Sequence, residues 1–203
     1  MMGVTLLGVV LIFLSVGLNI QTAESCRCLQ RHPQEQFCTS EMVILANVTG
    51  KRLPARNQIN LFQNKIKIIK DLKGSNNANR IQYVYTDSSS CGITLDQGLY
   101  MLSGHWLENG IKVMMCNLVN QWEHLSLTEQ ENFNQTYKMG CNCTISTCSD
   151  SPCCPKSKNE CKWEINSPHS HEYVCLKDSD GICSWYMPRS KVDVDAVCQQ
   201  RRG

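Results

Sequence analysis

Residues 26–38 read CRCLQRHPQEQFC and place Cys26, Cys28 and Cys38 within one short stretch. Chain ends usually fray unless something ties them down. Cross-links at both Cys26 and Cys28 would hold the intervening Arg27 extended between two anchored points. The stretch therefore predicts a rigid segment in a protein that depends on disulfides, and it marks where we expect the mature chain to begin.

The preceding segment, residues 1–25, has the features of a secretory signal peptide. The apolar run VTLLGVVLIFLSVGLNI is followed by QTAES, in which Ala23 and Ser25 are small residues at the −3 and −1 positions of a cut after Ser25. A transmembrane anchor is the alternative, because the run is nearly long enough to span a bilayer. The cleavage pattern and the cysteine-rich chain that follows favour a soluble protein secreted to the extracellular space or extracellular matrix.

All 14 cysteines follow this leader, and the even number predicts a framework of seven disulfides in an oxidising compartment. Zinc storage is the alternative for pairs such as CRC, CNC and CC. The paired C-x₂-C knuckles of structural zinc sites are absent, which favours disulfides. The formal net charge of +2 permits loose binding to acidic matrix polymers but does not indicate a nucleic-acid-binding protein.

The spacing of the cysteines predicts two subdomains, residues 26–141 and 142–203. Five cysteines are scattered from Cys26 to Cys116, which implies a hydrophobic core, whereas nine crowd the chain from Cys141 to Cys198. Apolar or alternating runs in the first part predict strands at EMVILANV, NKIKIIKDLKG, RIQYVYT, GLYMLSG and IKVMMCNLV. Five such strands suggest a small closed barrel, so we expect a mainly β fold with helices (α+β).

Two local signals refine this prediction. Asn109-Gly110 is a strong hairpin turn signal between the last two strands. Ser126-Leu127-Thr128-Glu129 is a capping box, which predicts a helix that continues to about Tyr137, with Gly140 at its end. Short strands separated by turn residues are expected in the last third.

The sequence offers little for catalysis. His169 and His171 form an H-x-H pair that could bind a metal, but they follow Pro168, and a solvated loop is the favoured interpretation. No catalytic motif such as G-x-S-x-G or H-E-x-x-H occurs, so we do not expect an enzyme. Three N-glycosylation sequons occur; Asn47 and Asn134 are the better acceptors, whereas Asn142 lies between two cysteines that should both be bridged.

The chain end itself can bind a metal if cleavage falls after Ser25. Cys26 would then carry a free α-amine, which titrates near pH 8 and can chelate zinc together with the carbonyl of the same residue. A metalloprotease zinc keeps one position open for water or substrate, and a rigid chain end could fill that position without offering a bond to cut. The residues alone leave open that the cross-links merely order the terminus.

The opening stretch resembles the C-x-C-x₃-HPQ-x₃-C start of the tissue inhibitors of metalloproteinases. The resemblance continues through KIKIIKDLKG, YTDSSSCG, WEHLSLTEQ, YKMGCNCTISTC, NECKW and DGICSWY, and so covers almost all of the mature chain. It implies a five-stranded OB-fold barrel, the netrin-like domain, in residues 26–141, followed by a small disulfide-rich β subdomain. It also implies a secreted inhibitor of matrix metalloproteinases, and of related metalloproteases, that binds the target's catalytic zinc and has no cofactor of its own.

The resemblance further implies a disulfide pairing. The implied pairs are Cys26–Cys91, Cys28–Cys116, Cys38–Cys141, Cys143–Cys183, Cys148–Cys153 and Cys161–Cys175. Cys154 and Cys198 are extra to the family pattern, and we expect them to pair with each other.

By the same resemblance, the protease-binding edge consists of Cys26, the zinc ligand, followed by Arg27, Cys28 and Leu29, with Ser88 and Ser89 alongside. Arg27 departs from the Thr or Ser usual at the position that enters the protease's S1′ pocket. A long cation is costly to desolvate in an apolar pocket, so we expect a narrower or weaker inhibitory spectrum. A matrix- or receptor-binding netrin-like module with weak or no inhibition is the alternative function.

Overall fold

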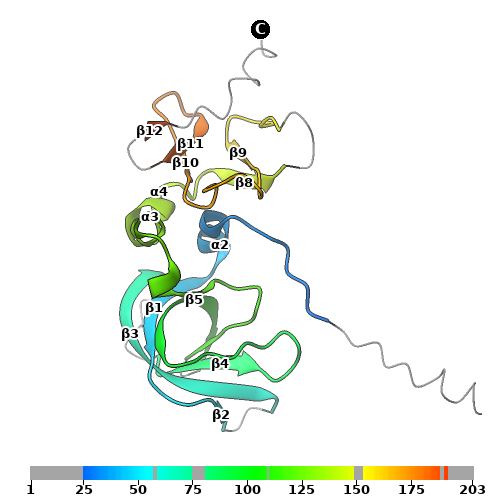
Figure 1. The fold of residues 1–203 in the computed structure, drawn as a ribbon, viewed down its shortest axis with the longest axis vertical. Helices are drawn as coiled ribbons and strands as arrows, with labels where there is room; N and C mark the ends of the chain where they lie inside the picture. Colours follow the sequence, from blue (N-terminus) through cyan, green and yellow to red (C-terminus); the bar gives the residue numbers. More distant parts are fainter. Residues whose placement is uncertain are drawn as a thin grey trace, which may run out of the picture.

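The computed structural model describes residues 25–56, 59–74, 81–108, 110–148, 153–187 and 190–191. Residues 1–24 of the expected signal peptide lie outside these residues, and so does the expected Cys154–Cys198 pair, because Cys198 is not among them. Figure 1 shows a β-barrel at one end and small sheets at the other, with helical segments between them. None of the helices in the described ranges is long and apolar enough to cross a bilayer.

The barrel is a closed, twisted sheet. Its strands are β1 (Met42–Val48), β2 (Leu53–Pro54), β3 (Leu61–Lys73), β4 (Tyr83–Asp87), β5 (Gly98–Leu107), β6 (Gly110–Lys112) and β7 (Val119–Gln121). They are ordered β1-β3-β4-β6-β5-β7, and β1 also pairs with β5, which closes the barrel. The five-stranded barrel expected from the sequence is confirmed, with β2 and β7 as short additions.

One predicted strand is wrong in detail. The run IKVMMCNLV was expected to form a single strand, but β6 ends at Lys112 and β7 begins at Val119. The intervening residues leave the sheet, and Cys116 in this loop is disulfide-bonded to Cys28. The loop between β6 and β7 therefore carries one of the two cross-links that anchor the N-terminal segment.

The barrel interior is filled by alternate residues of its strands. In β3, Ile66 is buried while Lys65 and Lys67 are exposed, as expected for a strand with one solvent-exposed face. Ile81 belongs to the buried core of the barrel, whereas Tyr83 and Tyr85 do not. The two tyrosine rings, 6.2 Å apart, line an outer pocket. The core consists of Met42, Ile44, Ala46, Val48, Ile66, Ile81, Val84, Leu95, Tyr100, Leu102, Ile111 and Val113.

The predicted capped helix is present in three consecutive parts, α3 (Leu127–Glu131), η3 (Asn132–Thr136), which has π-helical hydrogen bonding, and α4 (Tyr137–Met139). The Ser126 hydroxyl accepts from the Glu129 N–H, and the Glu129 carboxylate accepts from the Ser126 N–H, so the capping box is confirmed. A 3₁₀ turn, η2 (Trp122–His124), precedes it. The sequence did not predict α2 (Pro33–Thr39), the helix that follows the opening CRC.

A second hydrophobic core joins these helices to both ends of the molecule. Phe133 and Tyr137 pack against the barrel, and the same cluster also contains Phe37 of α2 and Val174 of the C-terminal part. Its members are Phe37, Val43, Leu45, Leu72, Met101, Leu118, Leu125, Phe133, Tyr137 and Val174. Apolar packing is therefore continuous from the barrel to the C-terminal sheets.

The C-terminal part consists of two small sheets. Strands β8 (Thr144–Thr147) and β9 (Glu160–Trp163) are parallel, and β10 (Val174–Lys177), β11 (Cys183–Met187) and β12 (Ser190–Lys191) are antiparallel. The core here is Ile145, Cys161, Trp163, Cys175, Cys183 and Trp185. Half of these residues are cysteines, which fits a region too small to be stabilised by apolar burial alone.

Candidate functional site

Three segments converge at the N-terminal edge of the barrel. Disulfides join Cys26 to Cys91 in the β4–β5 loop and Cys28 to Cys116 in the β6–β7 loop, with Cα–Cα distances of 5.1 and 5.2 Å. The Met115 N–H donates to the Cys91 carbonyl, 3.0 Å away, which joins the two loops to each other. The backbone between Cys26 and Cys28 is thus attached at both ends to loops that are themselves connected.

The β4–β5 loop is held by local hydrogen bonds. The Ser89 N–H donates to Asp87 Oδ1 at 2.8 Å, and the Gly92 N–H donates to the Ser89 carbonyl at 3.0 Å. The bond from the Ser89 N–H lowers the pKa of Asp87, whose other oxygen lies 3.3 Å from Lys112 Nζ. A Cβ at Gly92 would overlap the Asp87 carbonyl, so the turn closes only with glycine there. The loop that receives Cys26 is therefore tightly built.

The side chains at this edge face solvent. Arg27, Cys28, Ser88 and Ser89 are exposed, and Leu29 has 84% of its surface exposed. Cys26 is half-buried. The structure thus brings Cys26, Arg27, Cys28 and Leu29 into one cross-linked segment, next to the loop that carries Ser88 and Ser89. This combination of an immobilised backbone with exposed side chains suits binding to another molecule.

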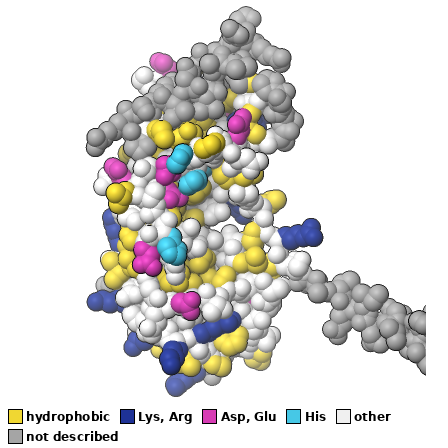
Figure 2. Space-filling model, in the orientation of Figure 1, with side chains coloured by type: hydrophobic (Ala, Val, Ile, Leu, Met, Phe, Trp, Pro, Cys, Tyr) yellow, Lys and Arg dark blue, Asp and Glu magenta, His cyan; other side chains and the backbone are white. Residues whose placement is uncertain are grey.

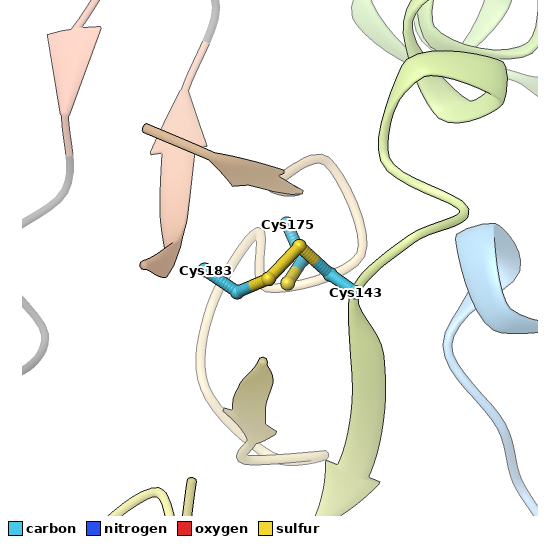
Figure 3. Close-up of side chains that lie close together, drawn as sticks. All are labelled: Cys143, Cys175 and Cys183. Atoms are coloured by element: carbon cyan, nitrogen blue, oxygen red, sulfur yellow. A yellow bond between two sulfur atoms is a disulfide. The ribbon is translucent and has the colours of Figure 1, made fainter. Parts of the chain in front are cut away.

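The four other disulfides observed are Cys38–Cys141, Cys143–Cys183, Cys148–Cys153 and Cys161–Cys175. All six observed bonds join the same cysteines that the family resemblance pairs. Sulfur atoms of Cys143, Cys175 and Cys183 lie close enough together to suggest a metal site, but Figure 3 shows that Cys143 and Cys183 are bonded to each other. Cys175 is bonded to Cys161, so no thiolate of this group is available for zinc.

The HPQ residues of the opening stretch form a joint between the barrel and the C-terminal sheets. His32 caps α2, since its Nδ1 accepts from the Gln34 N–H at 3.1 Å, and its Nε2 lies 3.1 Å from the Ser170 carbonyl. Nδ1 as acceptor requires the proton to be on Nε2, which donates to Ser170. Burial lowers the pKa of His32 to about 4, so this neutral form persists at physiological pH.

Gln34 completes the joint. Its Nε2 donates to the Cys175 carbonyl and its Oε1 accepts from the Cys175 N–H, both at 2.8 Å, so the side chain pairs with strand β10 as another strand would. A Cβ at Gly140 would overlap both Gln34 and the Cys175 carbonyl. Sequence analysis missed this joint; the available signal was His32 directly before Pro33, a pattern typical of a helix start.

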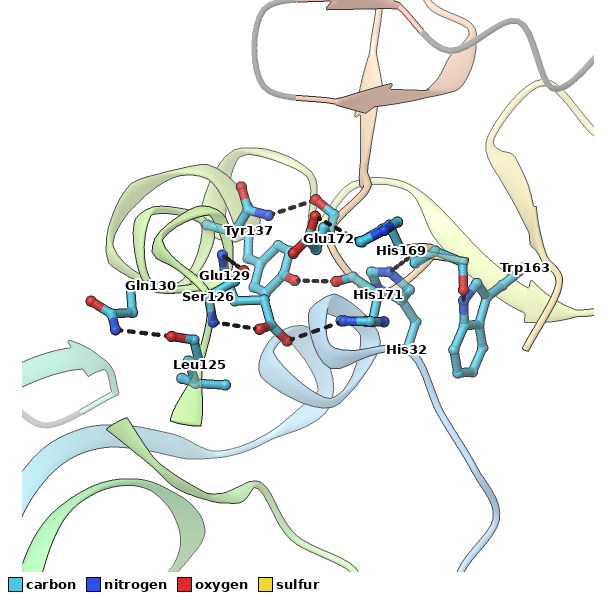
Figure 4. A network of polar contacts seen from close by, with 12 residues as sticks. His32, Leu125, Ser126, Glu129, Gln130, Tyr137, Trp163, His169, His171 and Glu172 are labelled. Atoms are coloured by element: carbon cyan, nitrogen blue, oxygen red, sulfur yellow. Dashed lines mark hydrogen bonds and ion pairs between the residues drawn. The ribbon is translucent and has the colours of Figure 1, made fainter. Parts of the chain in front are cut away.

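His169 and His171 lie in the β9–β10 connection, which confirms the predicted loop, but the loop is packed against the helical segment. His169 Nδ1 lies 3.5 Å from Glu172 Oε2, and His171 Nε2 lies 3.9 Å from Glu129 Oε1 (Figure 4). Glu129 belongs to α3, far away in sequence. The tertiary structure therefore adds the distant carboxylate of Glu129 to the histidine pair and the neighbouring Glu172.

The three sequons differ in exposure. Asn47, in β1, is half-buried, and Asn134 Oδ1 accepts from Lys70 Nζ at 2.9 Å. Asn142 is exposed, although it lies between two bridged cysteines. Which of the three sequons carries a glycan stays a prediction, with Asn47 and Asn134 as the expected acceptors.

Comparison with known proteins adds a family relationship. The family described as "Tissue inhibitor of metalloproteinase" matches residues 24–185. Metalloproteinase inhibitor 3 of Xenopus laevis is 36% identical over 192 residues, covering 89% of each chain. Metalloproteinase inhibitor 4 of Mus musculus is 40% identical over 182 residues, covering 80% of this chain and 81% of its own. Metalloproteinase inhibitor 3 of Gallus gallus is 35% identical over 206 residues, covering 94% and 97%.

Proposed function

The chain belongs to the tissue inhibitor of metalloproteinase family and is a metalloproteinase inhibitor rather than an enzyme. We propose that its N-terminal edge inhibits matrix metalloproteinases by chelating their catalytic zinc. The ligands are the α-amine and carbonyl of Cys26. The observation that carries the proposal is the double cross-link of Cys26 and Cys28 to two mutually bonded loops, with the neighbouring side chains exposed.

The chemistry of this chelate depends on cleavage after Ser25. Ser25 is exposed and has no regular secondary structure, which suits the substrate of a signal peptidase. Cleavage releases an amine that can replace the water on a protease's zinc, and the adjacent carbonyl completes a five-membered ring. Without that water the protease lacks its nucleophile. Because the disulfides order the segment in advance, little conformational entropy is lost on binding.

The remaining edge residues determine which proteases fit. Arg27 follows the chelating residue and enters the S1′ pocket, while Leu29, Ser88 and Ser89 contact the rim of the active-site cleft. A guanidinium in an apolar pocket is stabilised only where it meets an acid or reaches water. The inhibitor therefore favours proteases with deep S1′ pockets.

The proposed inhibitor is secreted and acts in the extracellular space or matrix. Every cysteine in the described part of the chain is disulfide-bonded, as is typical of an oxidising compartment. On the face drawn in Figure 2, Lys and Arg side chains gather over the barrel, which suits weak binding to acidic matrix polymers. Residues 26–141 form the inhibitory domain and residues 142–203 the second subdomain.

The test adds one alanine before Cys26 of the mature protein and measures inhibition of a matrix metalloproteinase. The extra residue moves the α-amine away from the chelate ring, so the inhibition constant should rise at least about 100-fold. The matched control adds one alanine after Gly203, which leaves the edge unchanged and should leave inhibition unchanged.

Equal inhibition by the native and the N-terminally extended proteins would refute chelation through Cys26. N-terminal sequencing of the secreted protein checks the premise, since a first residue other than Cys26 is incompatible with the proposed ligand pair.

A further inference from the structure

We propose a zinc-binding site, separate from the inhibitory edge, formed by Glu129, His171 and Glu172. One potential ligand atom from each lies within 4.8 Å of the other two. His169 is adjacent, with Nδ1 3.5 Å from Glu172 Oε2. The proposal concerns a zinc ion bound to this protein, not the zinc of a target protease.

The donor set matches zinc chemistry. Zinc takes imidazole nitrogen and carboxylate oxygen at about 2.0–2.2 Å, so neighbouring ligand atoms around a tetrahedral ion are about 3.3 Å apart. The separations within this group need to shrink by no more than about 1.5 Å, which side-chain rotation of the half-exposed His171 ring allows. His169 or water supplies the fourth ligand.

The charges at the site also favour a cation. Glu129 and Glu172 are largely buried, with 13% and 17% of their side-chain surfaces exposed, and their carboxylates face each other. Among the described residues, each carboxylate forms ion pairs only with a histidine: Glu172 with His169 at 3.5 Å, and Glu129 with His171 at 3.9 Å. Two carboxylates this close repel each other unless a positive charge lies between them, and a divalent ion would remove that repulsion.

Hydrogen bonds from buried side chains fix the backbone that carries two of the ligands. The hydroxyl of Tyr137 donates to the His171 carbonyl at 3.2 Å, and the Asn132 side chain donates to the Glu172 carbonyl at 2.9 Å (Figure 4). Both donors are buried. Glu129 is oriented separately, because its Oε2 accepts from the Ser126 N–H and leaves Oε1 for the metal. Such supporting hydrogen bonds are typical of metal sites that are organised before the ion binds.

The position of the site gives it a structural consequence. Glu129 lies on α3, which follows the barrel, whereas His171 and Glu172 lie between β9 and β10 of the C-terminal part. On the face drawn in Figure 2, histidine and acidic side chains are adjacent between the barrel and the C-terminal sheets. A bound zinc would therefore cross-link the two subdomains beside the His32–Gln34 joint.

The experiment titrates the purified, disulfide-bonded protein with zinc chloride in a calorimeter and compares single variants. Glu129→Gln keeps the capping box, because glutamine serves at that position as well as glutamate. His171→Ala removes an exposed side chain. The matched control is His105→Ala. This histidine also pairs with one carboxylate, Glu41, at 3.2 Å, but among the described residues it belongs to no group of three possible metal ligands.

We expect one zinc ion to bind per chain. The affinity for zinc should fall at least about tenfold in Glu129→Gln and in His171→Ala, and it should be unchanged in His105→Ala. Zinc should also raise the melting temperature of the native protein and of the His105 variant only. Absence of binding, or binding that all three variants retain, would overturn the site. Neither result bears on inhibition through Cys26, which is measured separately with the alanine-extended protein.

Discussion

Two parts of the same opening stretch are used in opposite ways. Residues 26–29 are covalently anchored and have exposed side chains, whereas residues 32–37 are anchored by buried side chains that reach the C-terminal sheets. Leu29 has 84% of its surface exposed, while His32 and Gln34 have none exposed. A surface that binds a partner thus combines a rigid backbone with free side chains, whereas an internal joint needs its polar side chains to be hydrogen-bonded within the molecule.

The largest effect on this contrast is expected from Gln34→Ala. The change leaves the buried Cys175 N–H and carbonyl without partners, which should cost about 4 kcal/mol of unfolding free energy. Urea unfolding under non-reducing conditions measures the loss. Inhibition by folded protein should be unchanged, because the disulfides that anchor residues 26–29 lead to Cys91 and Cys116 in the barrel loops, whereas Gln34 pairs with Cys175 of the C-terminal part.

Gln36→Ala is the matched control on the same helix, since its side chain makes only a long, exposed hydrogen bond of 3.4 Å to Arg31. Similar losses for Gln34→Ala and Gln36→Ala would show that the amide pairing with Cys175 contributes no more than an exposed contact.

The next effect is a dependence of the joint on pH. Burial lowers the pKa of His32 from 6.5 to about 4, so between these values the unfolded chain binds a proton that the folded chain does not. Above about pH 6.5 the titration of His32 does not reduce the free energy of unfolding. As the pH approaches 4, this free energy should fall by about 3 kcal/mol. Fluorescence of Trp163 and Trp185, whose rings lie 5.3 and 5.0 Å from the His32 ring, reports the change.

His32→Asn keeps a side-chain acceptor for the helix cap but removes the titrating ring. The variant should lose less stability between pH 6.5 and pH 4 than the native protein. An identical pH profile would assign the acid sensitivity to other groups. Glu160 adds to the loss only below its unfolded pKa of 4.5, and mostly below pH 4, because hydrogen bonds from Ser146 and Lys156 and the charge of Lys162 outweigh its burial and lower its folded pKa to about 2.

The smallest effect is expected at the edge itself. Arg27→Thr should strengthen inhibition about tenfold against proteases with shallow S1′ pockets and leave unfolding unchanged, because the Arg27 side chain is exposed. A panel of metalloproteinases with shallow and deep pockets measures the spectrum. Arg31→Thr, the same change at an exposed residue outside the cross-linked segment, should leave the spectrum unaltered. An unchanged spectrum for Arg27→Thr would contradict the placement of this side chain in S1′.

Local patterns predicted most of the barrel and the capped helix. The alternation in β3 and the Ser126–Glu129 capping box depend on residues a few positions apart, so they are readable without the fold. The same local patterns failed for residues 113–118, which form the loop bonded to Cys28 through Cys116, because a contact across 88 positions leaves no periodicity in the apolar run. They also failed for α2, whose start depends on His32 serving as both cap and joint.

The cysteine-rich stretch at residues 26–38, the uneven distribution of the cysteines and the family resemblance can all be recognised in the sequence, since they depend on residue identity and spacing along the chain. Only the tertiary structure decided which distant groups meet. Gln34 pairs with Cys175 across 141 positions, and Glu129 reaches the histidine loop, because packing of the helices against both sheets brings them together. Such contacts arise from packing between distant segments, and no periodicity within one segment encodes their partner.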